Sequence, residues 1–252
     1  PGMSPKDARD WTRRLNEALV VEAGAPESTQ PTLASLALHD PDQAADDLVE
    51  AVGSKGMSGL LLNTHPVERR ITDAEMEPVW AAAEELGVPV VLHPPTEGPH
   101  SALPDAAAYG NAFGRLIDST LVLSSLLLEG LLDRHPDLVL VAVHGGGFLP
   151  YQAKRLDGAR RVGPLAQHSP ERGDPSEYLP SLYFDTVAMS ASSIALLTQV
   201  AGPDRVLLGT DYPFPLGDQT PAQTVCDVGL SPAETRMVLR DNALKLFRRN
   251  VA

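Results

Sequence analysis

The sequence predicts an α/β fold built around a parallel sheet. Short, nearly continuous apolar runs alternate along the chain with longer amphipathic segments, and such runs are typical of parallel strands that are covered on both faces. The chain has 252 residues and 43% of them are hydrophobic, which is enough for one large core. We expect six strands, over residues 32–38, 59–63, 89–93, 138–144, 182–187 and 205–211.

Helical segments separate these strands. A further helix is expected before the first strand, over residues 5–22, and others follow the last strand. Capping boxes are expected at Thr72–Glu75 and at Ser231–Glu234, and Gly87 suits the end of a helix. The helices between strands are expected over residues 42–53, 73–86, 111–134, 148–161 and 190–201.

Six βα units that run in one direction fit either an open, doubly wound sheet or a closed barrel. The residues alone leave this choice open. An eight-stranded barrel needs two more strands, and this sequence begins with a helix, so we expect the first two strands to be absent from it. Residues 1–252 are interpreted as one domain, and residues 162–181 as a long loop that is functional or mobile.

The charge of the chain narrows the classes of partner. The formal net charge is −13 and the isoelectric point is about 4.9, so nucleic acid and anionic membranes are not expected to bind. Cys226 is the single cysteine, which excludes an internal disulfide and indicates a cytoplasmic protein. The most apolar run, residues 121–132, contains Glu129 and is too short to span a bilayer, so we expect a core helix there.

Three expected strands end in a residue that could bind a metal: His93, His144 and Asp211. Sites in parallel α/β folds are built at the carboxyl ends of the strands. Neutral imidazole together with carboxylate suits Zn²⁺, Mn²⁺ or Fe²⁺. A single histidine at a strand end is more often a structural residue, but three such residues at one end of a sheet favour a metal site or an acid–base site.

The stretch "HGGGFLPYQAKR", residues 144–155, places three glycines between a strand and a helix. Two functions fit this pattern: phosphate binding at a helix N-terminus, or room for a metal-bound water and substrate beside His144. No Walker A motif, dinucleotide fingerprint or G-x-S-x-G motif occurs in the sequence. Of the other histidines, His135 is expected to cap a helix, and His100 and His168 are assigned no role.

Three motifs resemble those of a known family. "LHPP" at 92–95, "HGGGFLPYQAKR" at 144–155 and "LLGTDYPFPLGD" at 207–218 are similar, in this order and spacing, to motifs of the metal-dependent decarboxylase branch of the amidohydrolase superfamily. Within this branch the sequence most resembles the aminocarboxymuconate-semialdehyde decarboxylases. The likeness extends over nearly the whole chain.

The resemblance implies a (β/α)₈ TIM barrel and one divalent metal ion, zinc or manganese. It implies that His93 and Asp211 are metal ligands and that His144 is the acid–base residue beside the metal-bound water. Arg155 matches an arginine that reaches the neighbouring subunit's site in this family and holds a substrate carboxylate. The implied assembly is therefore a homodimer.

The sequence departs from the family in two places. The family's other two metal ligands form an H-x-H or E-x-H pair on the first strand, and this sequence contains no such pair there. That departure agrees with the expected absence of the first two strands. Pro95 stands where aminocarboxymuconate-semialdehyde decarboxylase has a tryptophan, which puts that enzyme's substrate in doubt for this chain.

The favoured hypothesis is a non-oxidative decarboxylase of a small unsaturated or aromatic carboxylic acid, with His144 and Asp211 as its catalytic residues. Phe214, which follows Asp211, and His65, which follows a strand, are candidates to line the substrate site. One alternative is a metal-dependent hydrolase of an amide, ester or lactone. Another is a non-catalytic barrel that has lost its metal site, an idea supported only by the missing ligand pair.

Overall fold

The computed structural model describes residues 2–24, 30–167 and 173–247. Six strands of these residues form one parallel sheet, in which each strand pairs with the next along the chain. This order is that of a barrel, because a doubly wound sheet reverses direction at a switch point. The strands are β1 (Leu33–Ala34), β2 (Gly59–Asn63), β3 (Val90–His93), β4 (Leu140–Ala142), β5 (Tyr183–Asp185) and β6 (Val206–Leu207).

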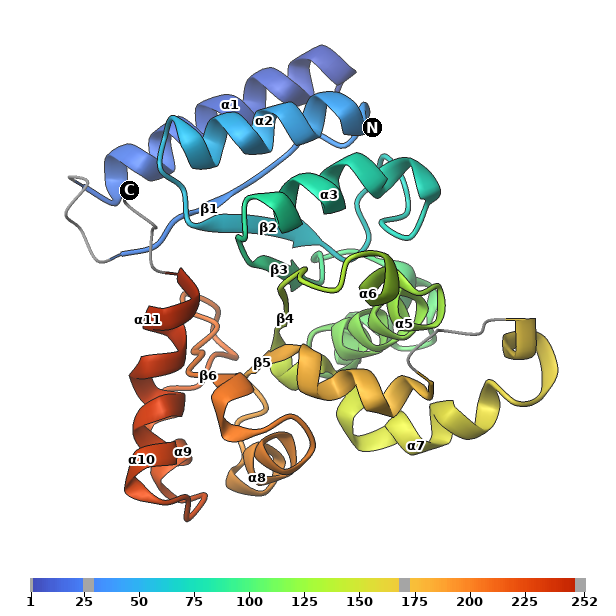
Figure 1. Cartoon of the computed structure of the whole chain (residues 1–252), viewed down its shortest axis with the longest axis vertical. Helices are drawn as coiled ribbons and strands as arrows, with labels where there is room; N and C mark the ends of the chain where they lie inside the picture. Colours follow the sequence, from blue (N-terminus) through green and yellow to red (C-terminus); the bar gives the residue numbers. More distant parts are fainter. Residues whose placement is uncertain (1, 25–29, 168–172, 248–252) are drawn as a thin grey trace.

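The strands follow an arc (Figure 1). Among the described residues β1 and β6 each pair with one neighbour, so this sheet is open between them. The α-helices are α1 (Pro5–Glu22), α2 (Pro41–Gly53), α3 (Glu77–Glu85), α4 (Ala106–Tyr109), α5 (Arg115–Leu128), α6 (Leu131–Arg134), α7 (Leu149–Ala159), α8 (Ala191–Val200), α9 (Pro221–Cys226), α10 (Pro232–Arg236) and α11 (Asn242–Phe247). Of these, α2, α3, α5 and α8 lie along the outer side of the arc, and α11 lies at its open side (Figure 1).

Short 3₁₀ and π turns occupy many of the connections. The π turns are η3 (Gly110–Gly114) and η8 (Met237–Asp241). The 3₁₀ turns are η1 (Ala74–Met76), η2 (Pro99–Ala102), η4 (His144–Gly146), η5 (Gly163–Gln167), η6 (Pro175–Ser181) and η7 (Pro203–Arg205). Residues 162–181, expected to be a long loop, therefore contain η5 and η6 within their described part, whereas His168 lies outside the described residues.

The expected elements are present, but several bounds differ. β2 and α1 have the expected ranges, whereas β1 and β6 are two residues long, shorter than the apolar runs that contain them. The single helix expected over 111–134 is divided into η3, α5 and α6. Gly130, at a φ of 73°, separates α5 from α6.

Of the expected helix ends, the capping box at Ser231 and the glycine at position 87 are confirmed, and the capping box at Thr72 is not. Ser231 and Glu234 form the expected capping box, in which each side chain accepts from the other residue's backbone N–H. The capping box expected at Thr72–Glu75 is wrong: Asp73 is the N-cap of η1, and its side chain accepts from the Arg70 N–H at 3.1 Å instead. Gly87 follows α3 with a φ of 62°, as expected for a helix end.

Two apolar clusters divide the side chains of the strands between them. The larger cluster lies between the sheet and the helices and includes Leu92, Phe184 and four leucine and valine residues of α5. The smaller cluster is a row across the other face of the sheet, formed by Val91, Val141, Tyr183 and Leu207, with α11 packed against it. Leu61 belongs to the same row by register and is 39% exposed, so this inner face is only partly covered.

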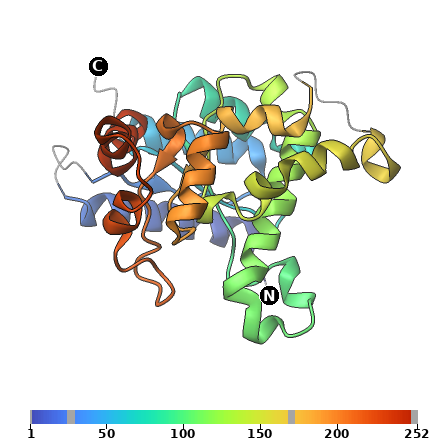
Figure 2. The same ribbon diagram turned by 90° about the horizontal axis from the view of Figure 1, so that it is seen from below.

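An arm, residues 98–114, follows the carboxyl end of β3 and leads into α5. Figure 2 shows it in green, projecting from the body of the molecule. The arm supplies one wall of the site described below. No helix of the described residues has the length and apolar character needed to cross a membrane.

Candidate metal centre

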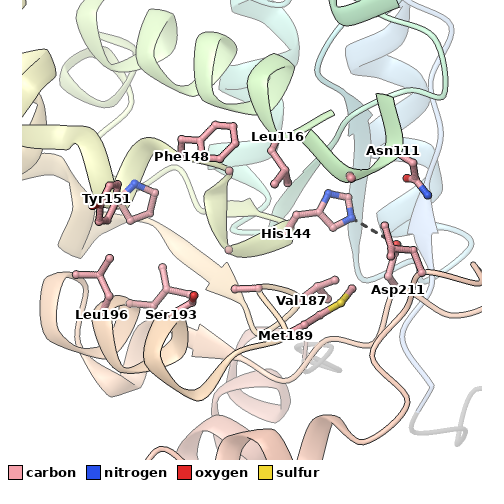
Figure 3. Close-up of a pocket in the computed structure, with 17 residues that line it drawn as sticks. Asn111, Leu116, His144, Phe148, Tyr151, Val187, Met189, Ser193, Leu196 and Asp211 are labelled. Atoms are coloured by element: carbon pink, nitrogen blue, oxygen red, sulfur yellow. Dashed lines mark ion pairs between the residues drawn. The ribbon is translucent and has the colours of Figure 1, made fainter. Parts of the chain in front are cut away.

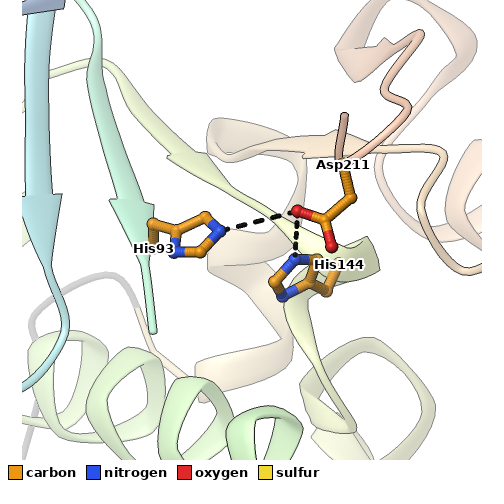
Figure 4. Close-up of side chains that lie close together, drawn as sticks. All are labelled: His93, His144 and Asp211. Carbon is orange, nitrogen blue, oxygen red and sulfur yellow. Dashed lines mark ion pairs between the residues drawn. The ribbon is translucent and has the colours of Figure 1, made fainter. Parts of the chain in front are cut away.

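Three side chains from three strands converge at the carboxyl end of the sheet (Figure 4). His93 is the last residue of β3, His144 follows β4 by two residues, and Asp211 follows β6 by four. One possible ligand atom from each lies within 4.8 Å of the other two. The sequence predicted all three as site residues from their positions alone, and the structure brings them together.

The distances in this cluster are slightly longer than those between two ligands of one metal ion. The Nε2 atom of His93 lies 3.8 Å from Oδ1 of Asp211, and Nε2 of His144 lies 3.5 Å from the same oxygen. Donor atoms held at about 2.1 Å from one ion are about 3 to 3.5 Å apart in tetrahedral or octahedral geometry. The His93, His144 and Asp211 cluster therefore fits one divalent cation after a small adjustment of the side chains.

The hydrogen bonding of His93 prepares it to bind a metal. Its Nδ1 lies 2.8 Å from the carbonyl oxygen of Pro94, which can only accept, so Nδ1 carries the proton. The lone pair of Nε2 then faces Asp211. Burial lowers the pKa of His93, and the neighbouring His144 lowers it further, against the opposing effects of the hydrogen bond to Pro94 and of Asp211. The neutral imidazole that a metal requires is thus favoured, with its orientation fixed from behind.

The backbone is strained at this site. His144, Asp211 and Met189 have φ values of 55°, 58° and 54°, a left-handed conformation that side chains with a Cβ rarely adopt. Asp105 is the fourth non-glycine residue with a positive φ in the described part of the chain. Because three of these four residues line one pocket, the strain is concentrated where functional residues are expected.

The three glycines after His144 allow close packing of the turn. A Cβ on Gly146 would lie 2.6 Å from the ring of Phe184, and one on Gly147 would lie 2.5 Å from the carbonyl oxygen of Leu116. Both glycines also have positive φ values, of 73° and 65°. The predicted close approach of the backbone is therefore confirmed.

The backbone N–H groups of this turn are already bonded within the chain. Those of Gly146 and Gly147 donate to carbonyl oxygens of the preceding turn at 3.0 and 3.1 Å. Those of Gly145 and Phe148 donate to side chains, to Asp185 at 2.8 Å and to Thr120 at 2.8 Å. Of the two functions left open for this stretch, room beside His144 fits these contacts, and phosphate binding by residues 145–148 does not.

Asp185 lies against the turn that follows His144, and it was not predicted from the sequence. It ends β5, is buried, and accepts from the backbone N–H groups of Gly145 at 2.8 Å and Val187 at 3.1 Å. Burial raises the pKa of Asp185, against the opposing influence of His144 and the backbone N–H groups. The available signal was a carboxylate at the end of an apolar strand, the same signal that identified Asp211.

A pocket of about 430 Å³ opens beside His144 and Asp211 (Figure 3). The arm and α5 form one wall, η4 and α7 a second, and the turn after β5 with α8 a third. Its lining residues besides His144 and Asp211 are Asn111, Ala112, Leu116, Gly145, Gly147, Phe148, Pro150, Tyr151, Val187, Ala188, Met189, Ser193, Leu196, Leu197 and Leu216.

The three residues predicted to bind substrate do not line this pocket. Arg155 is exposed on α7, and Phe214 is exposed beyond Asp211. His65 is partly buried, with Nδ1 3.1 Å from the hydroxyl of Thr64, and burial is the main cause of its lowered pKa. The roles of Arg155, Phe214 and His65 therefore stay predictions.

Two other histidines have structural contacts. His100, which was assigned no role, is buried against Asp118, with Nδ1 2.6 Å from a carboxylate oxygen. His135 is the C-cap residue of α6, as expected, and its ring lies between Glu77 and Glu84 at 2.8 Å from each.

The chain is similar to several characterised decarboxylases. It is 25% identical to 2-amino-3-carboxymuconate-6-semialdehyde decarboxylase of Dictyostelium discoideum over 249 residues, which are 96% of this chain and 68% of the relative. It is 26% identical to gamma-resorcylate decarboxylase of a Rhizobium species over 254 residues, which are 96% of this chain and 77% of the relative.

The fold of the chain is similar to that of solved decarboxylase structures. The 5-carboxyvanillate decarboxylase of Novosphingobium aromaticivorans, complexed with manganese and 4-hydroxy-3-methoxy-5-nitrobenzoic acid, superposes with a TM-score of 0.86 at 25% identity and covers 98% of this chain and 72% of its own. That of Sphingomonas paucimobilis gives a TM-score of 0.88 at 24% identity, covering 98% and 75%. The predicted barrel fold is thereby confirmed. The model of the amidohydrolase family, Amidohydro_2, matches residues 4–249, and the chain belongs to this family.

Proposed function

We propose that the protein is a metal-dependent, non-oxidative decarboxylase of a small unsaturated or aromatic carboxylic acid. The observation that carries this proposal is the convergence of His93, His144 and Asp211 beside a pocket, in a chain whose relatives include decarboxylases of such acids. Manganese in the 5-carboxyvanillate decarboxylase supports a divalent cation here, either manganese or zinc.

Nε2 of His93 and the carboxylate of Asp211 would hold the cation. When bound, it supplies a Lewis acid that polarises an oxygen of the substrate next to the carbon that loses CO₂. The left-handed backbone at Asp211 directs its carboxylate toward both imidazoles, and the hydrogen bond to Pro94 keeps the ring of His93 in place.

His144 would carry the proton that the reaction needs. Decarboxylation breaks the bond between carbon and the carboxylate and leaves its electron pair on that carbon. A proton held on Nε2 of His144 then forms the new C–H bond, and CO₂ leaves. Imidazole suits this role because its ordinary pKa lies near neutrality. The apolar walls of the pocket restrict access of water to the carbon that carries the electron pair.

Product analysis tests this reaction against hydrolysis, its nearest alternative. The full-length protein is incubated with manganese or zinc and a panel of hydroxybenzoic acids, and CO₂ is measured together with the decarboxylated phenol. We expect equal amounts of the two products, with no activity after chelation. Production of a new acid from ester, amide or lactone substrates, without CO₂ from any carboxylic acid, would contradict the proposal and support a hydrolase.

Arg155 is proposed to complete the substrate site of a second subunit in a homodimer. It is exposed on α7, one turn after Tyr151, which lines the pocket. The guanidinium can pair with a substrate carboxylate through two hydrogen bonds.

Mixing two inactive variants tests this arrangement. Arg155→Ala and Asp211→Asn are each expected to be inactive, whereas a mixed dimer has one site with both an intact metal centre and an arginine from its partner. Activity should return after the variants are unfolded and refolded together. A monomeric protein, or no recovery in mixed dimers, would contradict the role of Arg155.

A further inference from the structure

The pairing of the strands ends before the chain reaches the candidate metal centre. The last residues of β4 and β6 that pair with β5 are Ala142 and Leu207. His144 follows β4 by two residues, and Asp211 follows β6 by four. The positions of these two side chains therefore depend on contacts other than the register of the sheet.

Asp185, the last residue of β5, bonds to the chain that leads away from β4. One oxygen of its buried carboxylate accepts from the backbone N–H of Gly145 at 2.8 Å and from that of Val187 at 3.1 Å. Gly145 has a φ of 61° and directly follows His144, whose φ is 55°. The carboxylate thus fixes the second of two successive left-handed residues, and the imidazole belongs to the first.

Thr186, the next residue along the chain, bonds to the segment that leads away from β6. Its hydroxyl accepts from the backbone N–H of Gly209 at 3.0 Å and donates to the carbonyl oxygen of Gly209 at 3.3 Å. The side chain of Thr186 is fully buried, so these two hydrogen bonds are shielded from water. Gly209 lies two residues before Asp211, and its position constrains that of the carboxylate.

The absence of a side chain at Gly209 allows this segment to lie directly against the end of β5. A Cβ at this position would lie 2.9 Å from Cγ2 of Val187 and 3.0 Å from Cβ of Asp185. None of Asp185, Thr186 and Gly209 is among the described residues that line the pocket. Any effect of Asp185 and Thr186 on the reaction must therefore pass through His144 and Asp211.

We propose, on the basis of the decarboxylase function above, that Asp185 and Thr186 are positioning residues with separate tasks. Asp185 holds the turn that contains His144, the proposed proton donor. Thr186 holds the segment that contains Asp211, the proposed metal ligand. Two neighbouring residues at the end of β5 thereby set the distance between imidazole and carboxylate, which is 3.5 Å from Nε2 of His144 to Oδ1 of Asp211.

Substitutions at Asp185 test its task through kinetics. Asp185→Ala removes the acceptor and should lower kcat for CO₂ release about tenfold to a hundredfold, with KM and the dissociation constant of Mn²⁺ changed less than about threefold. Asp185→Asn retains an oxygen that can accept both hydrogen bonds, and its kcat should lie within about threefold of that of the unaltered protein. The substrate is the hydroxybenzoic acid that the unaltered protein decarboxylates fastest.

Substitutions at Thr186 test its task through metal binding. Thr186→Val retains the shape of the side chain without its hydroxyl and should weaken Mn²⁺ binding about tenfold, as measured by calorimetry on the full-length protein. Thr186→Ser retains a hydroxyl and should bind Mn²⁺ within about threefold of the unaltered affinity. Thr12→Val removes a hydroxyl that bonds to the carbonyl oxygen of Arg9 on α1 at 3.1 Å, and it should change neither kcat nor Mn²⁺ affinity.

Crystal structures of Asp185→Ala and Thr186→Val test the positions of the side chains without metal or turnover. We expect His144 to be displaced in the first variant and Asp211 in the second. Thermal unfolding shows which variants fold. Asp185→Glu, which moves the acceptor by one methylene and should also lower kcat, takes the place of an unfolded Asp185→Ala, and Thr186→Ala takes the place of an unfolded Thr186→Val.

The outcomes separate this inference from the proposed function. Unchanged kcat in Asp185→Ala, equal impairment of Asp185→Ala and Asp185→Asn, or undiminished Mn²⁺ affinity in Thr186→Val would overturn the separate tasks. Crystal structures in which His144 and Asp211 keep their positions would do the same. If the unaltered protein releases CO₂ from no acid, the decarboxylase function fails, and the crystal structures still decide whether Asp185 and Thr186 position the two side chains.

Discussion

Histidine and aspartate side chains lie close together at two places in the described part of the chain, and the distance between them differs. At the metal centre, Nε2 of His144 lies 3.5 Å from Asp211. Between the arm and α5, Nδ1 of His100 lies 2.6 Å from Asp118, whose other oxygen accepts from the backbone N–H of His100 at 2.9 Å. The side chains of His100 and Asp118 are 4% and 0% exposed, and those of His144 and Asp211 line a pocket.

The difference shows how the same two groups acquire different functions. Asp118 and His100 satisfy one another, and the glycines of the arm allow the ring to pack against the backbone, so this pair stabilises the arm. At the candidate metal centre, Nε2 of His93 and Nε2 of His144 face one oxygen of Asp211 at the longer distances of 3.8 and 3.5 Å, and the backbone of His144 and Asp211 is strained. Possible ligand atoms that converge beside a pocket at distances too long for strong hydrogen bonds indicate a site for a ligand. A buried histidine and aspartate that are joined by a short hydrogen bond indicate a structural role.

The largest expected effect is on catalysis. His144→Gln removes the proposed proton donor and should lower kcat by about a hundredfold to ten-thousandfold, while His93 and Asp211 still bind metal. Steady-state CO₂ release and metal content per chain measure the two properties separately. Unchanged kcat would remove His144 from the proposed reaction.

Loss of the His100–Asp118 hydrogen bonds should lower the stability of the protein. Asp118→Asn replaces a buried carboxylate that accepts two hydrogen bonds, and it should lower the free energy of unfolding by about 3 kcal/mol. Asp204→Asn changes an exposed carboxylate and should alter it by less than about 0.5 kcal/mol. Urea unfolding measures both, and equal effects of the two substitutions would mean that the His100–Asp118 pair contributes little.

Two glycine substitutions, one beside His100 and one at an exposed helix position, should change the free energy of unfolding in opposite directions. A Cβ on Gly114 would lie 2.5 Å from Cδ2 of His100, so Gly114→Ala should destabilise the protein by about 1 to 3 kcal/mol. Gly158 lies in α7 with no atom within 4 Å of such a Cβ, so Gly158→Ala should stabilise it by about 0.5 kcal/mol. Thermal unfolding of both variants gives the signs, and destabilisation by Gly158→Ala as large as that by Gly114→Ala would contradict the steric argument.

The smallest expected effect is the pH dependence caused by His65. Burial lowers the pKa of His65 below its ordinary value of 6.5, with additional lowering by His100 and Arg70 and an opposing effect of Asp118. The unfolded chain therefore takes up a proton at higher pH than the folded protein. The contribution of His65 to stability is complete above pH 6.5 and is lost as the pH falls from there through the folded pKa.

His65→Gln checks the sign of this effect. The free energy of unfolding should fall more steeply between about pH 7.5 and pH 5.5 in the unaltered protein than in the variant. A steeper fall in the variant would show that the folded state holds the proton on His65 more tightly than the unfolded chain does.

Much of the fold could be predicted because it rests on local signals. The apolar run of β2 and the proline-initiated pattern of α1 define their own bounds, and parallel pairing follows from strands that are apolar on both faces. The division of the helix expected over 111–134 was missed. Gly110 and Gly114 bound the π turn, and the ring of His100, which no local pattern places there, packs against both.

The convergence of His93, His144 and Asp211 was predictable for a similar reason, and its surroundings were not. His93, His144 and Asp211 could be found because the carboxyl ends of parallel strands meet at one edge of a sheet. The partner of His100 lies 18 residues away on α5, and no local pattern connects them. Met189 was missed because a methionine after a strand carries no polar signal, and its positive φ is a property of the folded backbone alone.

Metal content per chain tests the central claim most directly. Elemental analysis of the full-length protein, of Asp211→Asn and of Asp204→Asn compares an acid at the metal centre with an exposed one. The proposed centre predicts about one equivalent of manganese or zinc in the first and third proteins, and loss of that metal in Asp211→Asn. A folded full-length protein without metal, or undiminished metal in Asp211→Asn, would contradict the assignment of His93 and Asp211 as metal ligands beside His144.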